Sequence, residues 1–154
     1  MKNLTEDLLK KLSQLDREVK SQLRAKGFVV PIKSKNGTIK FGWYTVVRNN
    51  DGSYSVLDHA NESIVSGINL PQTAVITANS LALGKHKDAQ LIDLDRRYGY
   101  ADFKEQLYKR AIERDDKSLD YFDINLEKHK TALHKKAVYR CEITKSFDKL
   151  TKLL

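Results

Sequence analysis

Residues 38–58 read TIKFGWYTVVRNNDGSYSVLD, and this stretch decides the fold class. β-branched and aromatic residues recur from Thr38 to Arg48, which is typical of a strand with one buried face. The NNDG segment at 49–52 predicts a turn, because Asn and Gly tolerate the backbone angles of tight turns. A second strand follows through Tyr54 and Val56, so the stretch predicts an antiparallel hairpin. The side chains expected on one face of the first strand are Ile39, Phe41, Trp43, Thr45 and Val47, with Gly42 as a bulge.

The predicted sheet extends in both directions from this hairpin. Upstream, FVVPI at 28–32 is rich in strand-forming residues, and Pro31 places it at a sheet edge. The NG pair at 36–37 is a strong signal for a hairpin turn. Downstream, ANE at 60–62 predicts another turn, after which residues 63–68 return as a strand. We therefore predict an antiparallel meander of three or four strands.

A helix is expected to cover this sheet. Pro71 suits the first turn of a helix, Asn69 lies just ahead as a cap, and Gly84 suits the position after its end. A sheet and an amphipathic helix each bury the other's apolar face, so residues 28–84 predict a two-layer unit. The apolar face of the helix is expected to consist of Ala74, Val75, Ala78, Leu81 and Ala82.

Residues 1–27 predict an N-terminal amphipathic helix. Leucine and valine recur there every three or four positions, within an arc of about 100° around the helix axis. Gly27 suits the left-handed position that follows a helix end. The spacing resembles a short coiled-coil seam, although packing on the sheet or on the last helix accounts for it equally well.

The remaining segment, residues 85–154, is expected to be helical. Two shorter helices meet at Gly99, and a long helix begins near Ser118. The apolar stripe of the long helix runs to Cys141 and then continues rotated by about 100°. The rotation predicts either a break near Thr144 or a change of packing partner there.

Together these elements predict an α+β fold. It consists of an N-terminal helix over 1–27, a three- to four-stranded β-meander covered by a helix over 28–84, and a C-terminal helical region with a long helix over 85–154. A chain of 154 residues has the size of one ordinary domain, so we expect a single domain overall.

The two striped helices predict an interaction or assembly module without enzymatic activity. The stripes can pair within one chain or between chains. Long polar helices bury little apolar surface alone, so we favour a homo-oligomer, with another protein as the other possible partner. The residues predicted to associate are Leu8, Leu12, Leu15, Val19, Leu126 and Leu133.

Positive charge supports an alternative function, sequence-nonspecific nucleic-acid binding. The chain has 28 Lys and Arg against 20 Asp and Glu, a net charge of +8 that attracts polyanions. RRYGY at 96–100 combines cations with aromatic rings, which suits phosphate contact and base stacking, but it also fits a helix end capped by Gly99. Residues 128–140 hold no acid, a feature that solubility or an acidic protein partner explains equally well. The residues expected to contact phosphates are Arg96, Arg97, Lys128, Lys135, Lys136 and Arg140.

The sequence contains no pattern typical of a catalytic or metal site. Cys141 is the single cysteine, which excludes an intramolecular disulfide and a Cys–His metal cluster. His129 and His134 are five residues apart and face different sides of a helix. Asp58 and His59 fit a turn better than an acid–base pair, and no nucleophile elbow or phosphate loop occurs. We therefore predict no enzymatic activity, no metal and no cofactor.

No segment of the sequence suggests contact with a membrane. The start, MKNLTED, has no apolar signal core, and no window approaches the roughly 20 apolar residues of a membrane span. We therefore predict no membrane partner and a cytoplasmic location.

The segments INLPQTA at 68–74 and DRRYG at 95–99 support a resemblance to a known group. With them in view, the order of elements resembles small uncharacterised proteins of marine tailed phages. In those proteins a short sheet, an Ala-rich helix, a Tyr-Gly helix end and a long charged helix also follow one another. The resemblance covers about residues 43–143. It implies an accessory or virion-associated role, in host cytoplasm or virion, and no activity, substrate or functional residue.

Overall fold

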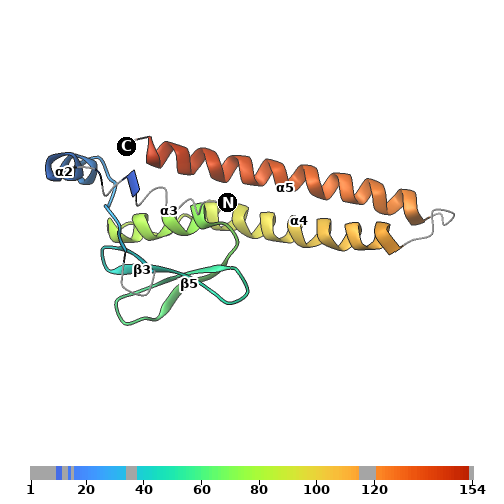
Figure 1. Cartoon of the computed structure of the whole chain (residues 1–154), viewed down its shortest axis with the longest axis horizontal. Helices are drawn as coiled ribbons and strands as arrows, with labels where there is room; N and C mark the ends of the chain where they lie inside the picture. The colour runs from blue at the N-terminus through green and yellow to red at the C-terminus, as the bar shows by residue number, and fades with distance from the viewer. Residues whose placement is uncertain (1–9, 12–13, 15, 34–37, 115–120, 153–154) are drawn as a thin grey trace.

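The computed structural model describes residues 10–11, 14, 16–33, 38–114 and 121–152 (Figure 1). Their fold is α+β, as predicted, with one antiparallel five-stranded sheet and four described helices. One helix, α3, lies on the sheet, and the two longest helices form an antiparallel hairpin that extends away from it (Figure 1). None of the described helices is both long enough and apolar enough to span a membrane.

The strands form an antiparallel meander, which confirms the predicted topology and adds one strand to it. Each strand pairs with its neighbour in the sequence, in the order β1-β2-β3-β4-β5. The expected strand over 28–32 begins only at Ile32, and the NG pair at 36–37 lies outside the described residues. The strands are β1 (Ile32–Lys33), β2 (Ile39–Phe41), β3 (Tyr44–Arg48), β4 (Tyr54–Leu57) and β5 (Ser63–Ile68).

The predicted long first strand of the hairpin is two strands joined by a tight turn. Phe41 pairs with Tyr44, so Gly42 and Trp43 are the two central turn residues and Gly42 is not a bulge. Gly42 has a φ of +60°, which a glycine at the first central position of a type II′ turn supplies without strain. The turn shifts the alternation of side chains by one residue. Val46 therefore faces the core, whereas Trp43 is 70% exposed, contrary to our prediction for Trp43.

Helix α3 (Pro71–Ala82) packs on the inner face of the sheet, as expected. Pro71 occupies its first turn, and Gly84, with a φ of +77°, follows its end. The N-cap position is held by Leu70 rather than Asn69, and it has no capping side chain of its own. The core between α3 and the sheet is built around Phe41, Val56, Ala74, Val75 and Ala78, all fully buried.

Helix α2 (Arg17–Ala25) is shorter than the predicted N-terminal helix. Asp16 has an extended backbone and accepts a hydrogen bond from Val19 N at 2.8 Å, so it caps a new helix instead of continuing one. Three residues predicted to associate, Leu8, Leu12 and Leu15, lie outside the described residues. Val19, the fourth residue predicted to associate through the N-terminal helix, packs against the main core.

Gly27 ends α2 in the way that the sequence predicts. It has a φ of +93°, and its N–H donates to Arg24 O while Phe28 N donates to Leu23 O at 2.9 Å. This pair of bonds is the Schellman motif, which places the apolar residue after the glycine against the last turn of the helix. Phe28 and Leu23 are accordingly both buried in the main core.

Helix α4 (Ala89–Arg114) is continuous, so the predicted helix end at Gly99 is wrong. Gly99 lies inside the helix because Asn69, in the connection between β5 and α3, packs directly against it. A Cβ atom at this position would lie 2.6 Å from Asn69 Cγ. The glycine is therefore required by a close tertiary contact and not by a cap.

Helix α5 (Tyr121–Thr151) is also continuous, and it changes packing partner near Thr144. Its first half packs along α4, whereas Phe147, nearer its end, is buried in the main core with the sheet and α3. Of the two alternatives that the rotated stripe left open, the change of partner is therefore the one observed.

The first part of α5 buries a different face from the predicted stripe, whereas Ile143 and Phe147, expected on the rotated stripe beyond Cys141, are buried as predicted. Ala132, which is not on the predicted stripe, is buried. Leu133 is 47% exposed, Leu126 is half-buried, and Cys141 is exposed. The prediction failed because α5 packs on α4 through small and polar side chains. The leucines of α5 therefore do not mark the surface of contact.

Candidate functional site: a basic groove between α4 and α5

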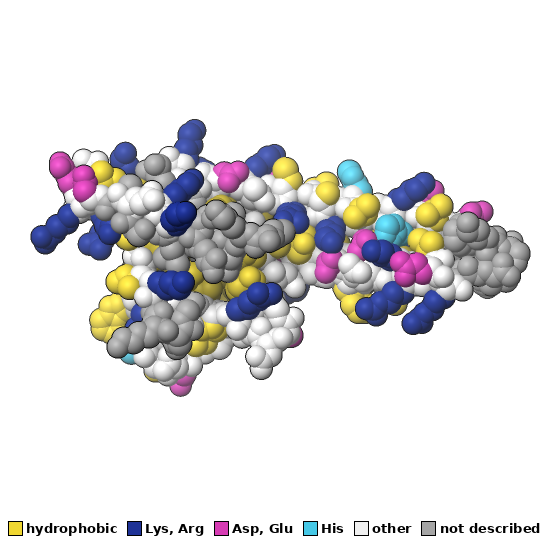
Figure 2. All heavy atoms as spheres, in the orientation of Figure 1, with side chains coloured by type: hydrophobic (Ala, Val, Ile, Leu, Met, Phe, Trp, Pro, Cys, Tyr) yellow, Lys and Arg dark blue, Asp and Glu magenta, His cyan; other side chains and the backbone are white. Residues whose placement is uncertain are grey.

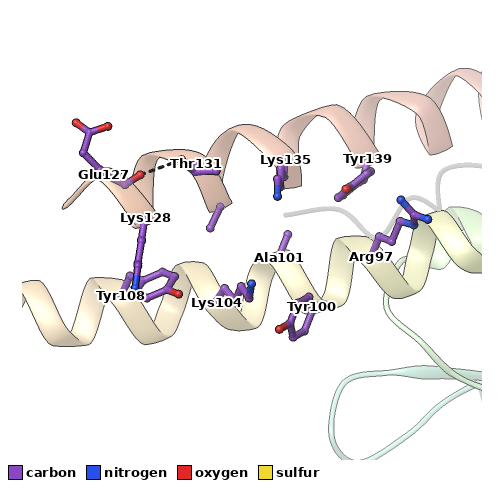
Figure 3. A pocket seen from close by; sticks show the side chains of 11 residues that line it. Arg97, Tyr100, Ala101, Lys104, Tyr108, Glu127, Lys128, Thr131, Lys135 and Tyr139 are labelled. Atoms are coloured by element: carbon purple, nitrogen blue, oxygen red, sulfur yellow. Dashed lines mark hydrogen bonds between the residues drawn. The ribbon is translucent and has the colours of Figure 1, made fainter. Parts of the chain in front are cut away.

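A groove of ≈ 440 Å³ runs between α4 and α5 on one side of the helical hairpin (Figure 3). Ala101 and Ala132, both buried, lie at its base, where their small side chains leave room between the helices. Its walls carry four cations, Arg97, Lys104, Lys128 and Lys135, and three tyrosines, Tyr100, Tyr108 and Tyr139.

Helical spacing brings the lining residues to one side of each helix. On α4, Arg97, Lys104 and Tyr108 are separated by seven and four residues, which keeps them within one face. On α5, Lys128, Lys135 and Tyr139 repeat the same spacing. Because the helices are antiparallel, the cations of one alternate along the groove with those of the other (Figure 3).

The groove is strongly cationic. Glu127 is the single acid among the lining residues that the structure describes, and its carboxylate lies 3.7 Å from Lys130 outside the groove. Within the described part of the chain, no acid forms an ion pair with Lys104, Lys128 or Lys135. Three positive charges are therefore available to an incoming anion.

Arg97 is held at one end of the groove by two partners. Its Nε donates to Asp93 Oδ2 at 2.8 Å, and both side chains are exposed. A hydrogen bond to the Tyr139 hydroxyl and the charge of Asp93 raise the pKa of Arg97 above its usual value. The arginine therefore keeps its charge, although Asp93 offsets part of it.

Two of the lysines lie over tyrosine rings. Lys104 Nζ is 4.6 Å from the centre of the Tyr100 ring on its own helix. Lys128 reaches across from α5, and its Nζ is 5.8 Å from the centre of the Tyr108 ring on α4 (Figure 3). A ring face attracts an ammonium group without neutralising it, so these contacts orient the lysines and leave their charge in place.

The structure brings together three of the six residues predicted to contact nucleic acid. Arg97, Lys128 and Lys135 line the groove. Lys136 does not, because its Nζ lies 2.6 Å from Asp102 Oδ1, a hydrogen bond that raises its pKa. The remaining two, Arg96 and Arg140, are exposed elsewhere on the helices.

Sequence reasoning missed Lys104 and did not place Tyr108 or Tyr139 at a binding site. The available signal was the repeated spacing of cations and tyrosines on two helices, which marks one shared face only when both helices are aligned. That alignment required knowing that α4 continues through Gly99.

The two helices are also joined by a pair of polar contacts outside the groove. His129 Nε2 lies 3.0 Å from Glu105 Oε1, next to the Lys136–Asp102 pair. Glu105 is buried, and its second oxygen has no hydrogen-bond partner among the described residues. No group of three or more His, Cys, Asp or Glu in that part of the chain is placed to hold a metal ion. These contacts therefore serve to align the helices.

Basic and acidic side chains are intermixed elsewhere on the surface. On the face shown in Figure 2, Lys, Arg, Asp and Glu lie close together along the helical hairpin. The groove differs in having unpaired cations in a concave surface. No known protein family, curated protein or solved structure matches the chain.

Proposed function

We propose that this protein is a non-enzymatic interaction module whose α4–α5 groove binds the phosphate backbone of nucleic acid without reading its sequence. The observation that supports this proposal is the convergence of four cations, from two helices, on a groove whose described lining holds one acid. Lysine and arginine neutralise phosphates through charge, and contact with base edges is not needed for such binding.

The lining chemistry favours binding over catalysis. A hydrolytic site needs a nucleophile within hydrogen-bond reach of a base. Among the described lining residues the one aliphatic hydroxyl belongs to Thr131, which donates to the backbone oxygen of Glu127 at 3.0 Å. No histidine or cysteine is among these described lining residues. Its chemistry is that of an anion-binding surface.

Self-association is a second candidate function. Leu126 and Leu133 are seven residues apart on α5, and Leu133 is 47% exposed. They offer apolar surface at the edge of the helical hairpin, where a second copy would cover it.

We expect Leu133→Glu to dissociate any oligomer formed through this surface. Sedimentation velocity at tens of micromolar protein, a range typical of interface affinities, measures the oligomeric state. A wild-type monomer under these conditions would exclude this candidate.

The biological setting follows from the resemblance and the proposed ligand together. A nucleic-acid-binding module fits the accessory or virion-associated role that the resemblance implies. We propose the cytoplasm of a host cell, or the virion, as its location.

Charge reversal inside the groove tests the nucleic-acid proposal. Lys128→Glu combined with Lys135→Glu removes two unpaired cations and adds two repulsive charges. We expect this variant to bind a labelled oligonucleotide at least about tenfold more weakly at low salt. We also expect the slope of log affinity against log salt concentration to decrease in magnitude by about one to two. Fluorescence anisotropy over a series of salt concentrations measures both quantities.

The matched control reverses two cations outside the groove. Arg140→Glu combined with Lys149→Glu changes the net charge by the same amount on the same helix, and neither residue lines the groove. We expect a much smaller loss of affinity for this variant. Equal losses in the two variants would show that net charge alone drives binding. Failure of the wild-type protein to bind DNA and RNA at low salt would refute the proposal.

A further inference from the structure

A row of exposed apolar side chains lies on α4 beside the groove. Tyr100, Phe103 and Leu107 are 61%, 63% and 50% exposed. With 3.6 residues per turn, the three side chains fall within an arc of about 60° around the helix axis. Tyr100 also lines the groove, so this outer row begins at the groove wall and continues over its rim.

The outer row is surrounded by cations. Arg96 and Arg110 are each seven residues from Phe103, which places them on its side of the helix. Both are exposed, and neither forms an ion pair with a described residue. Lys104 lies over the Tyr100 ring. The outer row therefore has positive charge along its length.

The acids of this stretch face elsewhere. Between residues 96 and 110 the two acids are Asp102 and Glu105. Asp102 pairs with Lys136 of α5, and Glu105 is buried against His129. The surface around the outer row therefore combines exposed rings with unopposed cations, and it adjoins the four cations of the groove.

From this arrangement we infer that the nucleic acid bound by the groove is single-stranded, with bases stacked on Tyr100 and Phe103; this inference rests on the proposed function. The bases of a duplex are stacked inside the helix, so an exposed phenylalanine reaches them only by unstacking a base step, which costs free energy. The bases of a single strand are open on both faces, and an aromatic side chain next to a cationic groove is a surface on which they stack.

The charge of the outer row disfavours a second copy of this chain as its occupant. Two copies packed through Phe103 would bring Arg96, Lys104 and Arg110 of each molecule near their counterparts. Like charges placed opposite one another across an interface oppose association. A polyanion that also carries flat apolar rings matches both features of the row.

Substitutions of Phe103 separate stacking from apolar contact. Phe103→Leu keeps an apolar side chain but removes the ring, whereas Phe103→Trp enlarges the ring. We expect Phe103→Leu to weaken binding of an oligothymidylate of about 20 nucleotides by about fivefold or more, and Phe103→Trp to bind at least as well as the wild-type protein. Affinity for a duplex of equal length is expected to change by less than about twofold in either variant.

Trp43→Leu is the matched control, because Trp43 is an exposed ring on the β2–β3 turn and away from α4. It is expected to leave both affinities unchanged. The inference is overturned if Phe103→Leu weakens single-strand and duplex binding equally, or changes neither. It is also overturned if Phe103→Leu instead dissociates an oligomer in sedimentation velocity. Each of these outcomes leaves groove binding intact, whereas the loss of all wild-type binding removes the proposed function itself.

Discussion

Asn69 and Gly99 lie against each other where the connection from β5 to α3 crosses α4. Asn69 Nδ2 donates to the backbone oxygen of Asp95 at 3.1 Å, which holds the amide over the one position of α4 that lacks a side chain. A glycine inside a helix costs about 1 kcal/mol relative to alanine. The close approach of the amide explains why the helix retains it.

Gly99→Ala should therefore destabilise the protein, although alanine is the better helix former. The added Cβ would lie 2.6 Å from Asn69 Cγ, so the connection must shift, at a cost of about 1–3 kcal/mol. In an Asn69→Ala background the space is free, and the same substitution should stabilise the protein by up to about 1 kcal/mol. Urea unfolding of the four proteins measures the coupling. The same sign in both backgrounds would contradict this explanation.

Asp95 holds the two residues that lead into α3. Its carboxylate accepts hydrogen bonds from Asn69 N at 2.7 Å and from Leu70 N at 2.9 Å, and the residue is 3% exposed. Asp95→Ala would leave two backbone donors unsatisfied at the start of α3, and we expect a loss of about 2–4 kcal/mol in unfolding free energy. Asp93→Ala is the control, because its pair with Arg97 is exposed to solvent and contributes little to stability. Comparable losses in urea unfolding would argue that the two hydrogen bonds of Asp95 contribute little to stability.

These residue-scale contacts explain one limit of sequence reasoning. Gly99 next to Tyr98 fits a helix end when only its neighbours in the sequence are considered. The partner that decides its role, Asn69, is thirty residues away. The glycine after α2, by contrast, was correctly predicted because its hydrogen-bond partner, Arg24, belongs to the helix that it ends.

At the scale of elements, the sequence correctly predicted where turns occur but misassigned which side chains face the core. The turns at 49–52 and 60–62 formed as expected, with Gly52 and Asn61 at positive φ. Asp58 accepts hydrogen bonds from Ala60 N and Glu62 N, which supports the turn role over an acid–base pair. The alternation through residues 38–48 was misassigned, because one two-residue turn reverses which side chains face the core.

The same distinction applies to the candidate site. Charge and helical spacing alone predicted Arg97, Lys128 and Lys135. The sequence did not show that Lys136 is paired with Asp102, or that Lys104 lies in the groove, because both facts depend on how α4 and α5 are rotated against each other. Periodicity gives the angle between residues of one helix but not the direction of its partner.

The rotation of α5 can be tested directly by two truncations. Ile143 is fully buried with Leu70 and Leu91, so Ile143→Ala should cost about 2–5 kcal/mol. Leu133 was predicted to be inward but is 47% exposed, and Leu133→Ala should cost less than about 1 kcal/mol. Thermal or urea unfolding measures both. A larger loss at Leu133 than at Ile143 would mean that Leu133 is buried, as the sequence predicts, and not exposed as observed.

At the scale of the whole molecule, the core and the binding surface occupy different regions. The sheet, α3 and the end of α5 share the main core, which includes Phe41, Val75 and Phe147. The helical hairpin extends away from this core (Figure 1), and its buried residues farther out include Ala101, Glu105 and Ala132. The groove therefore lies where little apolar surface is buried, and polar pairs align the helices there.

This separation predicts two levels of local stability. Opening free energies are lowest where few apolar contacts are buried, so amides in 101–112 and 125–137 should exchange with solvent faster than those in 41–47 and 73–79. If the groove binds nucleic acid, a saturating oligonucleotide should slow exchange in the two hairpin segments and leave the sheet and α3 nearly unchanged, because a ligand stabilises only the states to which it binds. Hydrogen exchange followed by mass spectrometry measures both effects on one sample. Equal exchange rates in all four segments without the oligonucleotide would contradict the two levels of local stability. Slower exchange confined to the sheet when the oligonucleotide is added would place the ligand elsewhere.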